Sequence, residues 1–230
     1  MARQDAKSGN DSPRAAAPAA RDWAAIIRAR LAGTQPHHEP QQWLLPVTWE
    51  PGTPRHDKLF AREPTPAAVL IPLVERRELT VLFTQRATQL RNHAGQISFP
   101  GGRIEASDDG PRAAALREAR EEIGLDERFV TVIGYLPDHL VVTGFRVTPV
   151  VGFVQPGFEL LLASDEVEDS FEVPVDYLFD PANHVLRRRR SAVTGELTDF
   201  HDIPFGERNI WGATAGMLLT LYRLCNPPPP

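Results

Sequence analysis

The sequence GGRIEASD (101–108) is followed, after eight residues, by REAREEIG (117–124). Residues 111–123 predict a helix, because Pro111 suits a first helical turn and Gly124 suits the end of one. On this helix Glu118, Glu121 and Glu122 stand at positions i, i+3 and i+4, so their carboxylates share one face. The other face carries small apolar residues, which let the helix lie close to a sheet.

Three carboxylates at this spacing repel one another, by roughly 0.2–0.5 kcal/mol per pair on a bare helix. Arg117, four residues before Glu121, offsets part of this repulsion. A hard divalent cation would offset it further, and Mg²⁺ and Mn²⁺ prefer oxygen ligands. The preceding glycine pair lets backbone approach a metal ion or phosphates closely. The residues therefore indicate metal-assisted hydrolysis of a phosphate compound, although an acidic, solvated helix face remains an open alternative.

Apolar runs outside this segment predict a sheet. AAVLIPLV (67–74) has the pattern of a buried strand, and LTVLFTQR (79–86) that of the strand returning from a hairpin. Strands and helices in mixed order indicate an α/β or α+β domain with a mixed sheet between helices. The other expected elements are helices at 21–32 and 213–225, strands at 130–135 and 147–154, a helical turn at 171–180, and a hairpin of 184–190 with 198–203.

The chain divides into three predicted parts. Residues 1–20 are expected to form a disordered tail, because they are rich in Ala, Ser, Pro and Asn. Residues 21–64 are expected to provide an N-terminal helix and an extended connector that packs on the core. Residues 65–226 are the predicted catalytic domain.

Composition limits the class of function. The 230 residues carry a formal net charge of −5, which argues against broad nucleic-acid binding because phosphate contacts need a positive surface. No apolar stretch approaches the ~18 residues of a membrane span, so no membrane association is expected. The N-terminus lacks a secretory apolar segment, and a cytoplasmic location is expected, with a transit peptide as the weaker alternative. Cys225 is the only cysteine, which excludes an internal disulfide and a Cys-based zinc site.

Residues 102–125 resemble the Nudix box, whose pattern is G-x5-E-x7-R-E-U-x-E-E-x-G-U, with U an aliphatic residue. Three departures are visible. Asp108 stands where the family has its first Glu, one extra residue separates it from the Arg, and Ala119 is a small version of the aliphatic position. We expect the shorter Asp108 to cap the helix rather than to hold a metal ion. The matching residues are Arg117, Glu118, Glu121, Glu122, Gly124 and Leu125.

The departures and several further segments resemble the coenzyme A pyrophosphatase subfamily, which has the same Asp and the same insertion. The resemblance covers residues 67–224. Its segments are LFTQR (82–86), Leu90-Arg91, Gly95-Gln96, SFPGG (98–102), EVPV (172–175) and IWGATA (210–215).

The resemblance implies a Nudix-type α/β/α sandwich and a Mg²⁺ or Mn²⁺ cofactor. The ion would be held by Glu118, Glu121, Glu122 and a backbone carbonyl of the glycine pair, which we assign to Gly102. Arg117 would orient the carboxylates, since a guanidinium is a bidentate partner of fixed geometry. The implied reaction is attack of metal-activated water on the diphosphate of coenzyme A, which gives 3′,5′-ADP and 4′-phosphopantetheine.

The implied catalytic residues are Glu118, Glu121, Glu122 and Arg117, and the expected partner is a small-molecule substrate. The candidates for binding that substrate are Arg86, Arg91, Gly101, Gly102 and Arg103, although each arginine is equally well explained as a surface residue.

Several points stay open. The general base is Glu118 in some relatives and a carboxylate of a later loop in others, for which Glu166 and Glu168 are the local candidates; both are equally well explained as solvated acids. The substrate could instead be ADP-ribose or a dinucleoside polyphosphate, and a non-catalytic nucleotide-binding module is the third alternative. A homodimer is a further possibility. The basic run at 187–190 is better explained by a solvated hairpin than by a site for the 3′-phosphate of coenzyme A.

Overall fold

The structure of the chain is a computed structural model, which describes residues 21–36, 44, 63–90, 93–141, 143–190 and 197–227. Its helices and strands follow the order α1 (Trp23–Leu31), β1 (Thr65–Glu75), β2 (Leu79–Arg86), β3 (Ile97–Ser98), β4 (Gly101–Arg103), α3 (Gly110–Ile123), η2 (Glu127–Phe129), β5 (Val130–Tyr135), β6 (His139–Leu140), β7 (Phe145–Val154), β8 (Val167–Pro174), α4 (Val175–Leu178), η3 (Pro181–Asn183), β9 (Val185–Arg190), β10 (Leu197–Phe205), β11 (Arg208–Trp211) and α5 (Gly212–Cys225).

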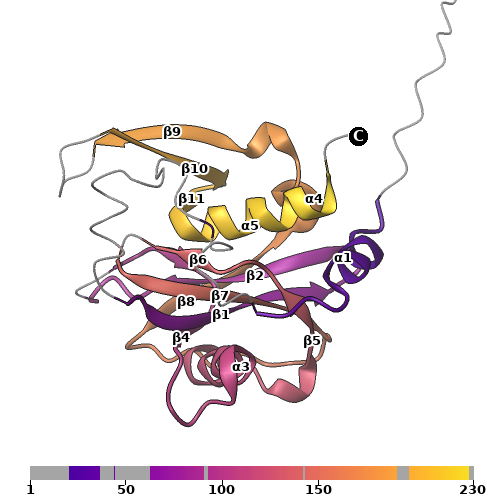
Figure 1. Ribbon diagram of the computed structural model, residues 1–230, viewed down its shortest axis with the longest axis vertical. Helices are drawn as coiled ribbons and strands as arrows, with labels where there is room; N and C mark the ends of the chain where they lie inside the picture. The colour runs from indigo at the N-terminus through magenta and orange to yellow at the C-terminus, as the bar shows by residue number, and fades with distance from the viewer. Residues whose placement is uncertain are drawn as a thin grey trace, which may run out of the picture.

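An eight-stranded sheet runs through the middle of the molecule. Five of its strands follow the order β3-β2-β1-β7-β5, and the other three pair with members of this series: β4 with β1, β6 with β7, and β8 with β2. Helix α3 covers one face of the sheet, and α5 lies on the other side together with the smaller sheet β11-β10-β9 (Figure 1). The predicted class, a mixed sheet between helices, is confirmed.

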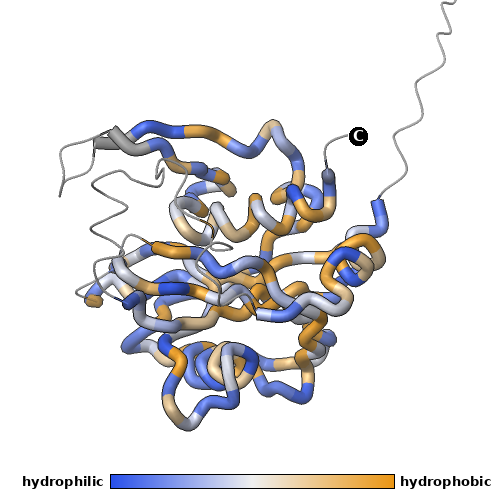
Figure 2. The backbone as a smooth tube through the Cα atoms, viewed as in Figure 1, coloured by the Kyte–Doolittle hydropathy of each residue, from blue (hydrophilic) through white to orange (hydrophobic). Residues whose placement is uncertain are grey.

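The central position of strand β1 in the sheet explains why its sequence is apolar almost throughout. It pairs with β7 in parallel, from Thr65 opposite Phe145 to Val74 opposite Val154. Its side chains alternate between the two faces, so Ala67, Ile71 and Leu73 enter the core under α1 and α5, whereas even-numbered residues enter the core under α3. Figure 2 shows this apolar interior as orange segments between more hydrophilic outer elements.

Helix α3 begins and ends close to the predicted residues. Pro111 lies in its first turn, and Gly124 ends it in the left-handed conformation, with φ of 69°. The prediction that Asp108 caps this helix is wrong, because the N-cap is Asp109, whose side chain makes no capping hydrogen bond. The Asp108 carboxylate binds Arg117 instead, since a charged, bidentate guanidinium is a stronger partner than one backbone N–H.

The predicted helical turn at 171–180 is only partly correct. Strand β8 continues to Pro174, and only residues 175–178 form the short helix α4. The reason is the antiparallel pairing of β8 with β2, which extends from Val167 opposite Arg86 to Pro174 opposite Thr80. The short strands β3, β4, β6 and β11 and strand β8 were not predicted, whereas the hairpin of β9 and β10 was.

The N-terminal helix belongs to the core on the α5 side. Trp23, Ile27 and Leu31 of α1 are buried there, and the indole N–H of Trp23 donates to Asp176 at 2.6 Å. The predicted amphipathic helix is confirmed, while residues 1–20, 37–43 and 45–62 lie outside the described residues. The proposed domain limits stay a prediction. Among the described helices, none is long and apolar enough to span a membrane.

His139 joins the sheet to α5. Its ring is 8% exposed, with Nδ1 3.0 Å from the Pro137 carbonyl oxygen and Nε2 3.2 Å from the Thr220 hydroxyl. Burial lowers the pKa of His139 from 6.5 to about 4, because it disfavours the charged ring. The neighbouring Asp138, just before β6, and Arg146 of β7 are paired with each other.

This burial predicts a pH-dependent stability. Between pH 6.5 and pH 4 the unfolded chain holds a proton on His139 that the folded chain does not hold, so stability falls as pH falls through this window. We expect the wild type to lose about 2 kcal/mol more than His139→Gln between pH 7 and pH 5. Urea unfolding at the two pH values measures this difference, and equal losses in both proteins would contradict the assignment.

Candidate active site

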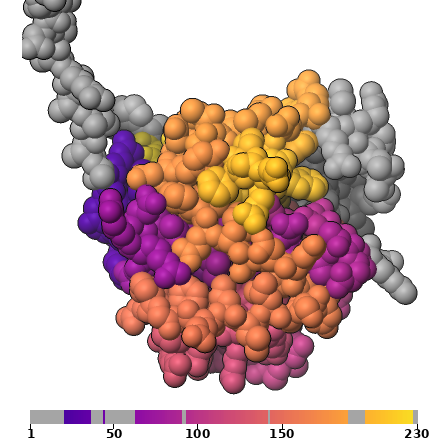
Figure 3. All heavy atoms as spheres, turned by 180° about the vertical axis from the view of Figure 1, so that it is seen from behind, coloured from indigo at the N-terminus to yellow at the C-terminus, as the bar shows by residue number. Residues whose placement is uncertain are grey.

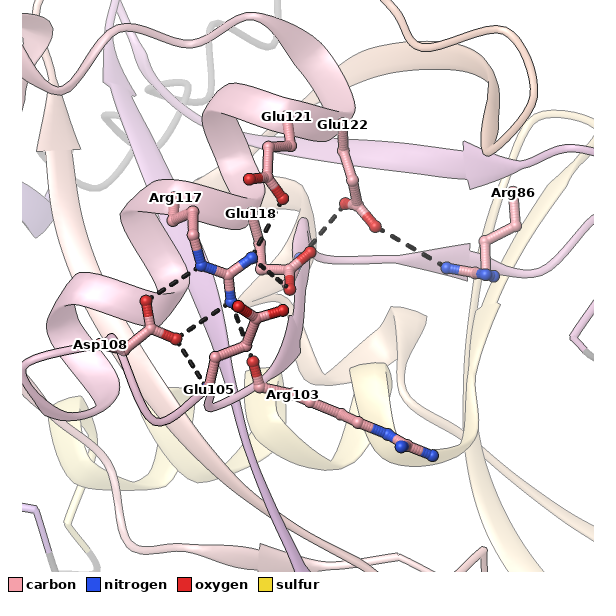
Figure 4. Close-up of polar contacts among 9 residues, drawn as sticks. Arg86, Arg103, Glu105, Asp108, Arg117, Glu118, Glu121 and Glu122 are labelled. Carbon is pink, nitrogen blue, oxygen red and sulfur yellow. Dashed lines mark hydrogen bonds and ion pairs between the residues drawn. The ribbon is translucent and has the colours of Figure 1, made fainter.

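The carboxylates of Glu118 and Glu122, on α3, lie against the glycine pair of β4; Figure 4 shows these side chains with Glu121 and Arg117. Gly101 and Gly102 pair with Val69 and Ala68 of β1. A Cβ on Gly101 would lie 2.4 Å from the Ala68 carbonyl oxygen, and one on Gly102 would lie 2.3 Å from Glu118 Oε1. The Gly101 contact is with the fixed backbone of β1, so glycine is required there for β4 to pair this closely, whereas a side chain at position 102 would displace the Glu118 carboxylate from its place.

Arg117 holds the start of this site together. Its Nε and Nη2 donate to the two carboxylate oxygens of Asp108 at 2.9 and 3.0 Å, and Nη2 also donates to the Arg103 carbonyl oxygen at 3.0 Å. Its Nη1 donates to Glu118 Oε1 and to Glu121 Oε2, each at 3.0 Å. The predicted orienting role has a geometric basis, because one guanidinium fixes two of the three carboxylates.

Glu122 occupies the buried end of the cluster and is 4% exposed. Its Oε2 accepts a hydrogen bond from the Gly101 N–H at 3.2 Å, and its Oε1 lies 3.8 Å from Arg86 Nη1. Burial is the main reason that the pKa of Glu122 rises to about 7, and the charges of Glu118 and Glu166 raise it further. Burial also raises the pKa of Glu118, against the opposing effect of Arg117.

The three carboxylates share a face, but they do not form a closed ligand group. Within the described part of the chain, no three His, Cys, Asp or Glu side chains are gathered as they would be around a metal ion. Glu118 and Glu121 turn toward Arg117, whereas Glu122 turns toward Gly101 and Arg86 (Figure 4). The metal-ligand assignment stays a prediction.

The candidate substrate residues are distributed unevenly. Arg86, at the end of β2, faces Glu122, and its Nε is buried without a hydrogen-bond partner among the described residues. The Arg103 side chain points away from the carboxylates in Figure 4 and lies over the Phe145 ring at 5.5 Å. Arg91 lies outside the described residues. The structure thus brings Arg86 to the site and leaves Arg103 apart from it.

The structure distinguishes Glu166 from Glu168. Both side chains are exposed, but the charge of Glu166 contributes to the raised pKa of Glu118 and of Glu122, whereas that of Glu168 contributes to neither. Two backbone contacts hold this turn near the site: Ala163 N–H donates to the Glu122 carbonyl oxygen, and the Glu166 carbonyl accepts from Ala87 N–H, each at 2.9 Å. Sequence alone could not separate the two glutamates, because strand pairing decides which one faces α3.

Other candidates have structural roles. Phe99 is buried and stacks on Phe83 at 5.2 Å. Burial raises the pKa of Cys225 to about 11, which fits an unreactive thiol. Arg187 and Arg188 form ion pairs with Asp202 and Asp199, as the interpretation of a solvated hairpin expects.

A mixed sheet with an acidic helix against a glycine turn is the arrangement that the sequence resemblance implied, and comparisons with known proteins agree. A family model described as the NUDIX domain matches residues 64–192. The uncharacterized Nudix hydrolase NudL of Citrobacter koseri is 51% identical over 158 residues, 67% of this chain and 80% of that protein. NudL of Salmonella paratyphi B is 49% identical over 120 residues, 52% of this chain and 61% of that protein. The chain belongs to the Nudix hydrolase family.

Some solved structures are similar at lower identity. An Ap4A hydrolase of C. elegans, solved as a binary complex, is 17% identical, with a TM-score of 0.41 over 48% of this chain and 80% of that one. A protein of Deinococcus radiodurans is 12% identical, with a TM-score of 0.47 over 77% and 90%. Both scores are below 0.5, so the family assignment rests on the sequence matches.

The close approach of β4 to β1 is testable by substitution. We expect Gly101→Ala to lower the free energy of unfolding by about 1–3 kcal/mol, because its Cβ would overlap the Ala68 carbonyl oxygen and force β4 away from β1. Gly216→Ala is the matched control, since its Cβ would meet only His139 Cδ2 at 3.9 Å. Denaturant unfolding compares the variants, and a Gly101→Ala protein as stable as the control would contradict the described contact.

Proposed function

We propose that the chain hydrolyses the diphosphate linkage of coenzyme A or its derivatives, using Mg²⁺ or Mn²⁺, to give 3′,5′-ADP and 4′-phosphopantetheine or its acylated form. The observation that carries this proposal is the set of three carboxylates on one face of α3, two of which contact the glycine pair of β4, with Arg86 beside Glu122. Such a set supplies oxygen ligands and an anion-binding group at one place, which hydrolysis of a diphosphate requires.

The three carboxylates have the ligand chemistry that a hard divalent cation prefers, although they are not gathered around a single point. Glu118 Oε2, Glu121 Oε1 and Glu122 Oε1 accept no hydrogen bond from any group that the structure describes. One oxygen of each carboxylate is therefore held by a hydrogen bond while the other accepts none, and that of Glu122 lies 3.8 Å from Arg86 Nη1. The raised pKa of Glu122 also supports the fit, since it marks a buried acid without a full countercharge. We assign the ion to Glu118, Glu121, Glu122 and the Gly102 carbonyl.

When bound, the cation polarises phosphoryl oxygens and makes water a better nucleophile. The protein side chains supply the remaining functions. Arg117 keeps Glu118 and Glu121 oriented through its Nη1 contacts. Arg86, with its unpaired Nε, is the proposed ligand of a substrate phosphate. Glu166 is the proposed base, because its carboxylate is exposed and close enough to influence both Glu118 and Glu122.

The preference for coenzyme A rests on the subfamily segments, and their positions support it. LFTQR lies on β2, SFPGG runs from β3 into β4, and IWGATA joins β11 to α5. The Thr214 hydroxyl of IWGATA donates to the carbonyl oxygen of Ile97, the residue between Gly95-Gln96 and SFPGG, at 3.1 Å. Motifs that are linked through β3 in this way, although they are more than 100 residues apart in sequence, are expected if together they select one substrate.

A product screen tests the activity and the metal site together. The purified protein should release 3′,5′-ADP from coenzyme A with added Mg²⁺ or Mn²⁺, and Glu122→Gln should lower this rate at least a hundredfold by removing one ligand charge. Glu127→Gln, an exposed position at η2 away from the cluster, is the control and should retain wild-type turnover. Products are identified by mass spectrometry. Turnover of ADP-ribose or dinucleoside polyphosphates in place of coenzyme A would reject the substrate, and normal turnover by Glu122→Gln would reject the metal site.

The two loop glutamates provide a second, matched test. We expect Glu166→Gln to lower kcat by roughly 10²–10⁴-fold with little change in KM, because a positioned base contributes about that much. Glu168→Gln should leave kcat unchanged, since its charge does not act on the cluster. Steady-state kinetics on both variants decide the point. Equal effects of the two substitutions would refute the assignment of Glu166 as the base.

A further inference from the structure

A buried hydrogen bond joins the C-terminal helix to the strand that leads into the active site. The hydroxyl of Thr214, in the first turn of α5, donates to the carbonyl oxygen of Ile97 in β3 at 3.1 Å. Both residues are buried, at 8% and 6% exposure. The Gln96 carbonyl accepts from the Arg86 N–H of β2, so the Ile97 carbonyl points the opposite way and depends on Thr214 for its partner.

This strand continues directly into the glycine pair. Ser98 pairs with Thr84 of β2, both through the ladder and through contacts of the Thr84 hydroxyl with the Ser98 carbonyl and hydroxyl. The Pro100 carbonyl then accepts from Leu70 N–H at 2.9 Å, and the next N–H, that of Gly101, binds Glu122. Only three residues therefore separate the contact with α5 from the contact with the buried carboxylate.

A second contact connects the same C-terminal segment to the same turn. The Arg208 guanidinium of β11 lies 4.1 Å from the Phe171 ring centroid and forms an ion pair with Asp169. Phe171 stacks on Phe83, which stacks on Phe99, at 5.6 and 5.2 Å. This stack of three rings ends at Phe99, two residues before Gly101. In the rear view, yellow C-terminal residues lie beside magenta residues of the middle of the chain, in agreement with these contacts (Figure 3).

We propose that Thr214 is a positioning residue for the active site: through the Ile97 carbonyl it sets the place of β3, and thereby directs the Gly101 N–H at Glu122 and keeps Gly102 against Glu118. The expected effect of Thr214 on turnover rests on the proposed function, whereas its expected effect on the Gly101 contact does not. It assigns the C-terminal β11–α5 segment a role in arranging the carboxylates, from which it is separated by about 90 residues of sequence.

The test compares Thr214→Val, which lacks the donor but keeps the shape, with Thr214→Ser, which keeps the donor. We expect Thr214→Val to lower kcat for coenzyme A roughly tenfold while KM stays within about twofold, and to speed amide exchange at Gly101 roughly tenfold. Thr214→Ser should restore both quantities. Thr214→Ala replaces Thr214→Val if the latter does not fold.

Thr220→Val is the matched control on the same helix. The Thr220 hydroxyl binds the Gly216 carbonyl and the His139 ring, not β3, so this variant should be less stable without any change in kcat or in Gly101 exchange. Unchanged Gly101 exchange in Thr214→Val, or changes equal to those of Thr220→Val, would overturn the proposal. Absence of coenzyme A turnover in the wild type would instead reject the proposed substrate, while the exchange measurement still decides the role of Thr214.

Discussion

All five N–H donors of the Arg117 guanidinium are used, and the candidate site depends on this one group. Two contacts go to Asp108, one to the Arg103 carbonyl, and one each to Glu118 and Glu121. The guanidinium thereby joins the loop before α3, the end of β4 and the acidic face of the helix into one unit. A lysine, with three donors and no planar fork, could not make this set of contacts.

Elements that local sequence determines were predictable. Strand β2 runs from Leu79 to Arg86 and β5 from Val130 to Tyr135, as the apolar pattern indicated, and α3 ends at Gly124 because only glycine takes the left-handed conformation easily. Strand β3 has two residues, and β4 has three, of which two are glycines. Neither strand therefore has such a pattern. They exist because β2 and β1 each offer a partner edge, which is a property of the assembled sheet and not of the segment itself.

The same distinction applies to the site. The shared face of Glu118, Glu121 and Glu122 follows from helical spacing alone, and sequence could identify it. The places of Arg86 and Glu166 follow from the pairing of β8 with β2, where Arg86 stands opposite Val167. The prediction that Asp108 caps α3 was wrong for a related reason. The backbone N–H groups of the helix and the Arg117 guanidinium compete for one carboxylate, and only the folded structure shows that the guanidinium lies within reach of it.

The charge of the cluster explains why the proposed hydrolysis would require a cation. The acids outnumber the bases, so full ionisation leaves an excess of negative charge in a partly buried space, and this excess adds to the burial that raises the pKa values of Glu118 and Glu122. A diphosphate is itself an anion, and this surface would repel it. A divalent ion reverses the local sign, while the unpaired Nε of Arg86 offers a second point of attachment. Under the proposed function, the acid-rich helix would bind an anion only together with a metal ion, which would link substrate affinity to metal occupancy. The acids are Asp108, Glu118, Glu121, Glu122 and Glu166, and the bases are Arg86 and Arg117.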